Sequence, residues 1–404
     1  MQETTPLVLT VLVLGYALVS KQVARQYAAP ALFFVLIGMA LGPFGLHLLE
    51  AGPRTEGYTV LAQLALTVIL FNQAARLNMD RVRWHGLATL RLLLIGIPLT
   101  VALGALTAAV LLPVLPWWEA VCVAAIVAPT EVALIEALLE DHRIPERVRH
   151  ALSIESGFYD GFALAILLVA LGLASERTEP GDDHWAWFIF STEVLSLLAG
   201  AAVGLAGGVI VSWSRRHDWM TDTWAQLATL ALAFICFQIG EHIEASGFVA
   251  AFTGGLAFAF VSRRRIDDEL PTQVSDAAAQ LLELMVFAMF GAFAVIDGWS
   301  RADWRIVLFA VLALFAVRIA AVLISLVGTG LPTASRLFIG WFGPRGIGTV
   351  VLGLLVVDRG DIEHADVIGT IVVVTVTLSL VLHSATVAPG IRRLASARVS
   401  VPSP

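Results

Sequence analysis

The chain has 404 residues, of which 58% are hydrophobic and only 14% are charged, and its mean hydropathy is +0.85. Soluble domains carry about 25% charged residues, so this composition excludes a soluble globular protein and indicates a polytopic membrane protein. The net charge of −7 excludes little. Cys122 and Cys236 lie within apolar runs and suggest neither a disulfide framework nor a metal site. No motif for nucleotide binding, nucleic-acid binding or metalloprotease chemistry is present.

Runs of apolar residues predict thirteen transmembrane helices joined by short connections. The predicted spans cover residues 6–20, 30–47, 58–74, 88–112, 117–139, 151–174, 185–213, 223–240, 246–262, 277–296, 305–328, 335–357 and 367–390. No segment is left over for a soluble domain, so residues 1–404 are predicted to form one all-α transmembrane unit. We expect no cleavable signal peptide, because no basic segment precedes the first apolar run.

The basic residues predict the orientation of the spans. With the N-terminus outside, 18 of the 25 Lys and Arg residues fall on inner segments and five on outer segments, while Arg318 and Arg345 remain within spans. This asymmetry follows the positive-inside rule, and most tryptophans lie at span ends, as interface anchors do. We therefore expect a multi-pass protein of the cell membrane with a cytoplasmic C-terminus.

Two carboxylates, Glu155 and Asp160, occupy the sixth predicted span and lie deep in the membrane if this span is one helix. Helical spacing pairs Ser156 with Asp160 and Glu155 with Tyr159, each four residues apart. The alternative is a helix whose acids merely sit near the membrane surface. Because ionisable groups inside a membrane are costly and functional by default, we interpret them as part of a transport site.

Two other spans contain residues that interrupt a helix. In the fifth span, Pro129 lacks an N–H and its ring clashes with the carbonyl four residues earlier, although a simple proline kink is an alternative reading. In the twelfth span, residues 340–348 contain four glycines, Pro344 and Arg345 and do not suit a continuous helix. The two spans are seven apart, so they occupy corresponding positions if spans one to six and spans eight to thirteen form two repeats. Because seven is odd, corresponding spans cross the membrane in opposite directions, and the repeats are inverted. Such a pair of broken helices points to a transport site near the midplane.

The polar residues of these spans predict a cation site. Asp160 and Ser156 come from the sixth span, and Glu131 and the backbone of Thr130 come from the opened fifth span. All four offer hard oxygen ligands, which suit a hard cation and not a soft transition metal. The ends of the half-helices place dipole ends of both signs beside this site.

A buried guanidinium needs a carboxylate, and we predict that Glu155 pairs with Arg345. Tyr159 either donates its hydroxyl into this network or serves as an aromatic packing residue.

Three further acids lie in or near the spans. Glu136 and Glu193 lie towards span ends and are read as structural. Glu283 lies deeper and is either a partner of Arg318 or a second titratable group, and both readings stay open.

Three motifs in this order resemble the signatures of NhaP-type sodium/proton exchangers, in the monovalent cation:proton antiporter family. The resemblance covers essentially the whole chain and rests on Ala128-Pro129-Thr130-Glu131, Glu155-Ser156-Gly157-Phe158-Tyr159-Asp160-Gly161 and Gly340-Trp341-Phe342-Gly343-Pro344-Arg345-Gly346.

The resemblance implies an elevator-like exchanger that is usually a homodimer. It implies a core bundle from residues 88–174 and 305–390, and dimerisation or scaffold helices from residues 1–87 and 185–296. It also implies ion binding by Asp160, an acid–arginine pair of Glu155 with Arg345, and the further ligands Thr130, Glu131 and Ser156.

The chain departs from the family pattern at three places. Tyr159 stands where relatives usually carry Asn, and Glu131 stands where many carry Asp. The segment Phe71-Asn72-Gln73 is neutral where many relatives carry an acid, and we assign Asn72 to the polar network around the site. These departures bear on ion preference and pH range.

The sequence thus predicts a secondary transporter, not an enzyme, that exchanges a monovalent cation for H+ across the bilayer. Na+ is the first expectation, with Li+ or K+ as alternatives, and no cofactor and no nucleic-acid partner are expected. A single working carboxylate, Asp160, predicts electroneutral exchange. The alternative function is a cation channel or a transport-inactive sensor on the same scaffold.

Overall fold

The computed structural model describes residues 4–24, 29–49, 56–77, 87–131, 133–139, 141–175, 190–265, 271–359 and 362–399. These residues form helices and no strand, which confirms the predicted all-α class. Some predictions fall outside the described part: the basic residues Arg25, Arg54, Arg81, Arg83 and Arg177, residues 185–189 of the seventh span, and the side chain of Glu136.

The helices follow the predicted spans in order. They are α1 (Thr4–Ala24), α2 (Pro30–Leu41), α3 (Glu56–Arg76), α5 (Leu87–Arg91), α6 (Ile97–Leu111), α7 (Trp117–Val127), α8 (Glu136–Leu139), α9 (Glu146–Ala174), α11 (Ser196–Arg216), α12 (Asp222–His242), α13 (Gly247–Arg265), α14 (Gln273–Phe293), α15 (Val295–Arg301), α16 (Trp304–Val311), α17 (Arg318–Ser325), α18 (Thr333–Trp341), α19 (Ile347–Arg359) and α20 (Ala365–Val399). Three π-helical segments, η1 (Leu92–Gly96), η3 (Phe190–Leu195) and η4 (Leu312–Val317), and the 3-10 helix η2 (Ala133–Ile135) complete the elements.

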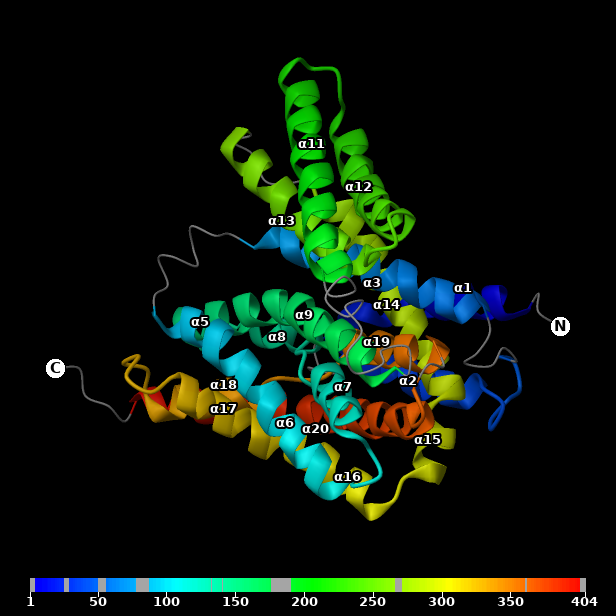
Figure 1. The fold of residues 1–404 in the computed structure, drawn as a ribbon, viewed down its shortest axis with the longest axis vertical. Helices are drawn as coiled ribbons and strands as arrows, with labels where there is room; N and C mark the ends of the chain where they lie inside the picture. Colours follow the sequence, from blue (N-terminus) through cyan, green and yellow to red (C-terminus); the bar gives the residue numbers. More distant parts are fainter. Residues whose placement is uncertain are drawn as a thin grey trace.

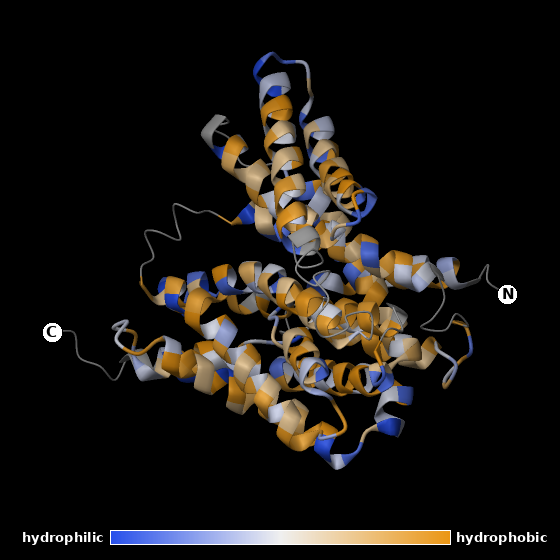
Figure 2. Ribbon diagram, viewed as in Figure 1, coloured by the Kyte–Doolittle hydropathy of each residue, from blue (hydrophilic) through white to orange (hydrophobic). Residues whose placement is uncertain are grey.

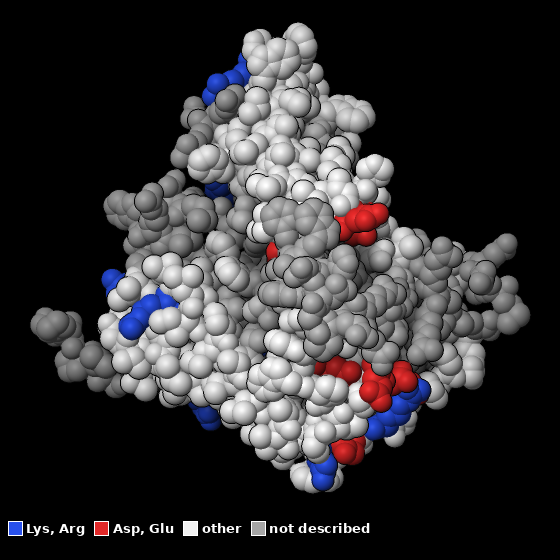
Figure 3. All heavy atoms as spheres, in the orientation of Figure 1, with Lys and Arg blue, Asp and Glu red and all other residues white. Residues whose placement is uncertain are grey.

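Nine helical segments of the described chain are long and apolar enough to cross a membrane. Four shorter apolar helices, α2, α7, α13 and α19, account for the remaining predicted spans. Hydrophobic residues cover most of the helical surface in Figure 2, and most of the described surface in Figure 3 carries no charged side chain. A helical membrane fold is thereby confirmed, while the count of thirteen crossings stays a prediction.

The helices gather in two regions in Figure 1. At the top of this view α11, α12 and α13 pack against one another, and α13 continues the contact to α3. The lower region contains α5 to α9 and α16 to α20, with α2, α3 and α14 between the two. The long helix α9 contacts α3, α7, α13, α18 and α19 and so links the regions.

Helical irregularities lie in four spans of the lower region. The fifth span is broken between α7 and η2, and the twelfth between α18 and α19, as Pro129 and Pro344 predict. The fourth and eleventh spans each contain a π-helical segment, η1 and η4, and η1 packs against α17 while η4 packs against α6. Irregularities in spans four and five thus recur in spans eleven and twelve. This correspondence favours the predicted inverted repeats.

Candidate functional site

The two broken helices meet at their breaks. The α-helix α7 ends at Val127, and α18 ends at Trp341 before the chain resumes as α19 at Ile347. Between these ends the backbone N–H of Glu131 donates a hydrogen bond of 2.8 Å to the carbonyl oxygen of Pro344. Because this bond satisfies backbone groups that the breaks leave open, each break stabilises the other.

Two glycines let the carboxylates approach the start of α19. A Cβ built on Gly346 would lie 2.6 Å from the Cβ of Glu131, and one built on Gly348 would lie 2.9 Å from Oδ1 of Asp160. Both acids are almost completely buried, Glu131 at 5% and Asp160 at 3% exposure. The positive end of the α19 dipole therefore faces two carboxylates that interact with each other.

Replacing Gly346 by alanine should disturb this crossing. We expect Gly346→Ala to destabilise the protein by about 1–3 kcal/mol, as overpacking in a dense core does, and to lower ion exchange. The measurement is thermal unfolding in detergent together with flux in proteoliposomes. The matched control is Gly15→Ala in α1, where a Cβ would meet no atom within 4 Å. Equal behaviour of the two variants would contradict the described crossing.

The structure brings together all four predicted cation ligands. Ser156 on α9 donates its hydroxyl to the carbonyl oxygen of Thr130 at 2.5 Å, which ties the sixth span to the break of the fifth. Asp160 lies one helical turn after Ser156, and its Oδ2 atom is buried without a hydrogen-bond partner among the described residues. An unsatisfied buried carboxylate oxygen is costly, so this position suits a cation or a proton.

Gln73 of α3 is a site residue that the sequence analysis missed. Its side chain lies beside the Asp160 carboxyl group, and its Oε1 is buried without a partner among the described residues. Asn72, which was assigned to the polar network, has no side-chain hydrogen bond in the described structure. The place of Asn72 in the polar network therefore stays a prediction.

The predicted pair of Glu155 with Arg345 is wrong, because Glu155 pairs with Arg318. Nη1 and Nη2 of Arg318 lie 3.1 Å from Oε1 and Oε2 of Glu155, which is the two-point geometry of a strong ion pair. Both side chains are buried, at 1% and 3% exposure. Since Arg318 is held by Glu155, the reading of Glu283 as its partner is also excluded.

Arg345 instead supports the broken backbone. Its Nη1 donates to the carbonyl oxygen of Gly343 at 2.5 Å, and its backbone N–H donates to Oγ of Ser379 at 2.7 Å. Nε and Nη2 have no hydrogen-bond partner within the described chain. The guanidinium is fully buried. It therefore places positive charge beside the break, where the last carbonyl groups of α18 have no partner within their own helix.

Tyr159 is completely buried next to both arginines. Its ring belongs to an apolar cluster with Leu93, Ile97, Val101 and Ala124. Its hydroxyl oxygen is buried without a hydrogen-bond partner among the described residues. The packing role proposed from the sequence is therefore present in the structure.

The described chain has no group of three or more His, Cys, Asp or Glu residues arranged to hold a metal ion. The Glu131–Asp160 pair offers two carboxylates only. This number, with neutral oxygens from Thr130 and Ser156, suits a cation of low charge.

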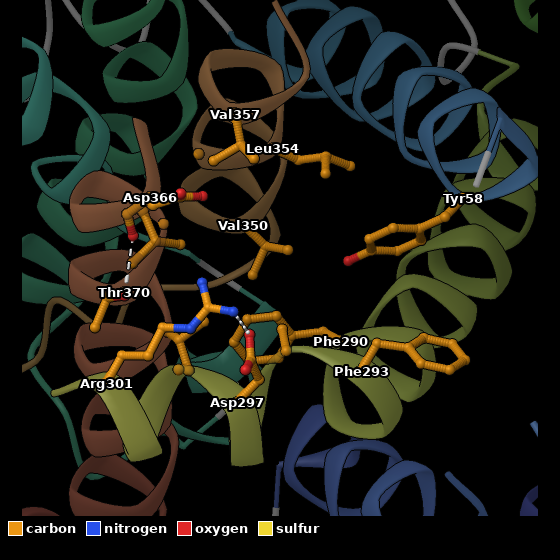
Figure 4. A pocket seen from close by; sticks show the side chains of 16 residues that line it. Tyr58, Phe290, Phe293, Asp297, Arg301, Val350, Leu354, Val357, Asp366 and Thr370 are labelled. Atoms are coloured by element: carbon orange, nitrogen blue, oxygen red, sulfur yellow. Dashed lines mark hydrogen bonds and ion pairs between the residues drawn. The ribbon is translucent and has the colours of Figure 1, made fainter. Parts of the chain in front are cut away.

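A cavity of about 660 Å3 lies beside α19, between α14, α15 and α20 (Figure 4). Its wall on α19 begins at Val350, one turn after the start of the helix, and continues to Val357. Asp297 and Arg301, which form an ion pair of 2.9 Å, and Asp366 provide its charged groups. The cavity therefore lies along α19, and Glu131 and Asp160 are not among the residues that line it.

Comparison with known proteins identifies the family of the chain. Residues 8–393 match the family described as "Sodium/hydrogen exchanger, transmembrane". The chain is 27% identical over 394 residues to the K+/H+ antiporter NhaP of Alkalimonas amylolytica, and the alignment covers 96% of this chain and 67% of that protein. It is 26% identical over 381 residues to the Na+/H+ antiporter NhaH of Halobacillus dabanensis, which covers 89% of this chain and 90% of that protein. The chain spans only 46% and 37% of the length of two yeast relatives.

The fold also has a known counterpart. It is similar to the structure of the sodium proton antiporter MjNhaP1 from Methanocaldococcus jannaschii, with a TM-score of 0.81 at 20% sequence identity over 98% of this chain and 99% of that one. This likeness confirms the predicted all-α membrane fold. The family match extends over nearly the whole length and includes the broken helices and the buried carboxylates, so the chain belongs to the sodium/hydrogen exchanger family.

Proposed function

We propose that this chain exchanges a monovalent cation, with Na+ as the first candidate, for H+ across the cell membrane. The observation that carries the proposal is the buried carboxylate pair of Glu131 and Asp160 at the crossing of the two broken helices. The relatives named above are antiporters for Na+ or K+, which supports cation exchange and leaves the choice of ion to experiment.

The proposed cycle is a competition for Asp160. In its ionised form Asp160 binds the cation together with Ser156, Glu131 and the Thr130 carbonyl. In its protonated form it is neutral and needs no cation. A charged, empty site is costly to move through the low dielectric of the membrane, so only the two loaded forms reorient. This restriction couples the cation flux to the proton flux.

We propose that the carboxylate site moves with a core bundle, residues 88–174 and 305–390, against scaffold helices from residues 1–87 and 185–296. The cavity beside α19 lies between these two sets, since Tyr58 of α3 and residues of α14 line it from the scaffold side. With the N-terminus outside, its charged end faces the outer surface, and Asp297 and Asp366 attract cations there. A homodimer that contacts through the scaffold completes the proposal.

The proposal is tested by flux in proteoliposomes with Na+, K+ and Li+ at several pH values. We expect saturable proton movement that requires a counter-cation. Current without counter-ion dependence would indicate a channel, and absence of any flux from a folded protein would indicate a sensor. Either outcome overturns the exchange function.

We expect exchange to be electroneutral, with one cation moved for one proton. Glu155 is held in an ion pair by Arg318, and Gln73 is uncharged, so Asp160 is the carboxylate that exchanges a proton for a cation in this scheme. Arginine does not lose its proton in proteins and cannot act as a carrier. The measurement is Na+-driven proton flux with and without a K+ diffusion potential. A rate that follows the potential would refute the single-carrier scheme and point to Glu131 or Glu283 as the second proton site.

A further inference from the structure

A pair of polar side chains on α20 contacts both ends of the break between α18 and α19. Ser379 and His383 lie four residues apart in α20, with exposures of 0% and 1%. Oγ of Ser379 accepts the backbone N–H of Arg345 at 2.7 Å. Nε2 of His383 lies 3.0 Å from the carbonyl oxygen of Trp341, the last residue of α18.

The two side chains also contact each other. Nδ1 of His383 lies 3.1 Å from Oγ of Ser379 and 2.9 Å from the Ser379 carbonyl oxygen. The carbonyls of Trp341 and Ser379 can only accept, and a neutral imidazole carries one N–H, so the ring donates to one of the two. In the tautomer with the hydrogen on Nε2 the ring donates to Trp341, and Nδ1 accepts from the Ser379 hydroxyl. The result is a continuous chain of hydrogen bonds from the Arg345 amide through Ser379 and His383 to Trp341.

This chain satisfies backbone groups that the break would otherwise leave open in the core. A buried backbone amide or carbonyl without a partner costs about 1–3 kcal/mol. The Arg345 amide lies before the first turn of α19, and the Trp341 carbonyl lies at the C-terminal end of α18. α20 thus fixes the distance between the end of one half-helix and the start of the next.

The same break segment touches the carboxylate site on its other side. The Pro344 carbonyl, next to the Arg345 amide, accepts the N–H of Glu131 at 2.8 Å. Gly346 and Gly348 follow directly, and both leave room only for the carboxylates of Glu131 and Asp160. A shift of the segment towards or away from α20 therefore moves the cation ligands.

We infer that His383 and Ser379 are positioning residues for the cation site, which they control through the backbone of the α18–α19 break. The inference rests on the proposed cation exchange. The two side chains do not touch the cation; they hold Pro344 and Gly346 where Glu131 and Asp160 can share one ion. Loss of either contact should weaken cation binding more than it slows the maximal exchange rate.

A purely packing role for His383 makes a different prediction. Its ring lies beside Phe315, at 6.0 Å between centroids, and beside Phe342, at 6.5 Å. The variant His383→Phe keeps an aromatic ring at this position and removes both hydrogen bonds. If only packing matters, His383→Phe should behave as the unaltered protein.

The test compares His383→Phe, His383→Gln and Ser379→Ala in proteoliposomes, with Na+ as the probe. We expect His383→Phe and Ser379→Ala to raise the KM for Na+ by roughly tenfold, as loss of an outer-shell hydrogen bond does, with a smaller effect on the maximal rate. His383→Gln offers one donor and one acceptor and should restore most of the affinity. The double variant His383→Phe/Ser379→Ala should lose less than the sum of the singles, because both act through one chain of hydrogen bonds.

The matched control is Thr386→Val, one turn further along α20. Thr386 accepts a hydrogen bond from the Trp341 indole at 3.1 Å and so contacts the same residue through its side chain only. Its KM should stay unchanged. An unchanged KM in both His383→Phe and Ser379→Ala, with exchange by the unaltered protein intact, would overturn the inference and leave the proposed function standing. Absence of exchange by the unaltered protein would refute the proposed function itself, and Na+-dependent thermal stabilisation would then report binding separately.

Discussion

Asp160→Asn is expected to abolish cation–proton exchange and to leave the protein folded. Asparagine has nearly the same shape and keeps an acceptor oxygen for the neighbouring Gln73 amide. It can neither bind a proton in the working range nor supply a negative charge to a cation. Because the proposed cycle needs both states of one carboxylate, this substitution removes both half-reactions at once.

The measurement is Na+-driven proton flux in proteoliposomes, with the thermal unfolding temperature in detergent as the folding check. Addition of Na+ should raise the unfolding temperature of the unaltered protein and not that of Asp160→Asn. The matched control is Glu193→Gln, which neutralises another acid inside a span, in η3, and should keep exchange. Flux above that of empty vesicles in Asp160→Asn would show that Asp160 is not the carrier.

The breaks in the fifth and twelfth spans could be predicted because their causes are local. Pro129 and Pro344 lack the N–H that a continuous helix needs, whatever surrounds them. The carboxylates Glu131 and Asp160 could be predicted for the same kind of reason, since a charge inside an apolar run is costly wherever it points. Properties of single residues and their immediate neighbours were sufficient for these features.

The partner of Glu155 could not be predicted because it depends on how a helix is rotated about its axis. Arg318 and Arg345 both lie within spans, and nothing in composition ranks them as partners. Arg318 follows directly on the π-helical segment η4, Leu312–Val317. A π-helical turn holds more residues than an α-turn, so it rotates the following face relative to a regular helix. The sequence of η4 is an ordinary apolar run and gives no sign of this.

Rotation also explains the choice between Asn72 and Gln73. The sequence shows two neighbouring amides in the third span. Successive residues of a helix point in different directions, so each amide contacts a different part of the structure. The sequence does not show which of the two lies beside Asp160. For His383 a signal was present: Ser379 and His383 are polar residues at helical spacing in an apolar span. The sequence could not show what these two side chains bind. They contact backbone atoms of residues 341 and 345, and backbone atoms give no sequence signal because they are common to all residue types.

The buried ion pair of Glu155 with Arg318 predicts a large loss of stability when either residue is replaced by alanine. We expect Glu155→Ala and Arg318→Ala each to cost about 3–5 kcal/mol, the range for stranding one partner of a buried pair. The contact is bidentate at 3.1 Å, and both side chains are almost completely buried. We therefore expect losses at the upper end of this range of unfolding free energy. The double variant should lose clearly less than the sum, because it leaves no buried charge without a partner.

A second double-mutant cycle within the same chain provides the control. Arg345 is as buried as Arg318, but its hydrogen bonds go to Gly343 and Ser379 and not to Glu155. Thermal unfolding in detergent of Glu155→Ala, Arg345→Ala and their double variant should therefore show losses that nearly add. Coupling is expected in the cycle with Arg318, where the two residues share hydrogen bonds, and such contacts give interaction energies of about 0.5–3 kcal/mol. Strong coupling to Arg345 with additivity for Arg318 would return the pair to the arrangement that the sequence suggested. In that arrangement Arg318, and not Arg345, would be the buried cation that needs another acid, and Glu283 would again be the candidate.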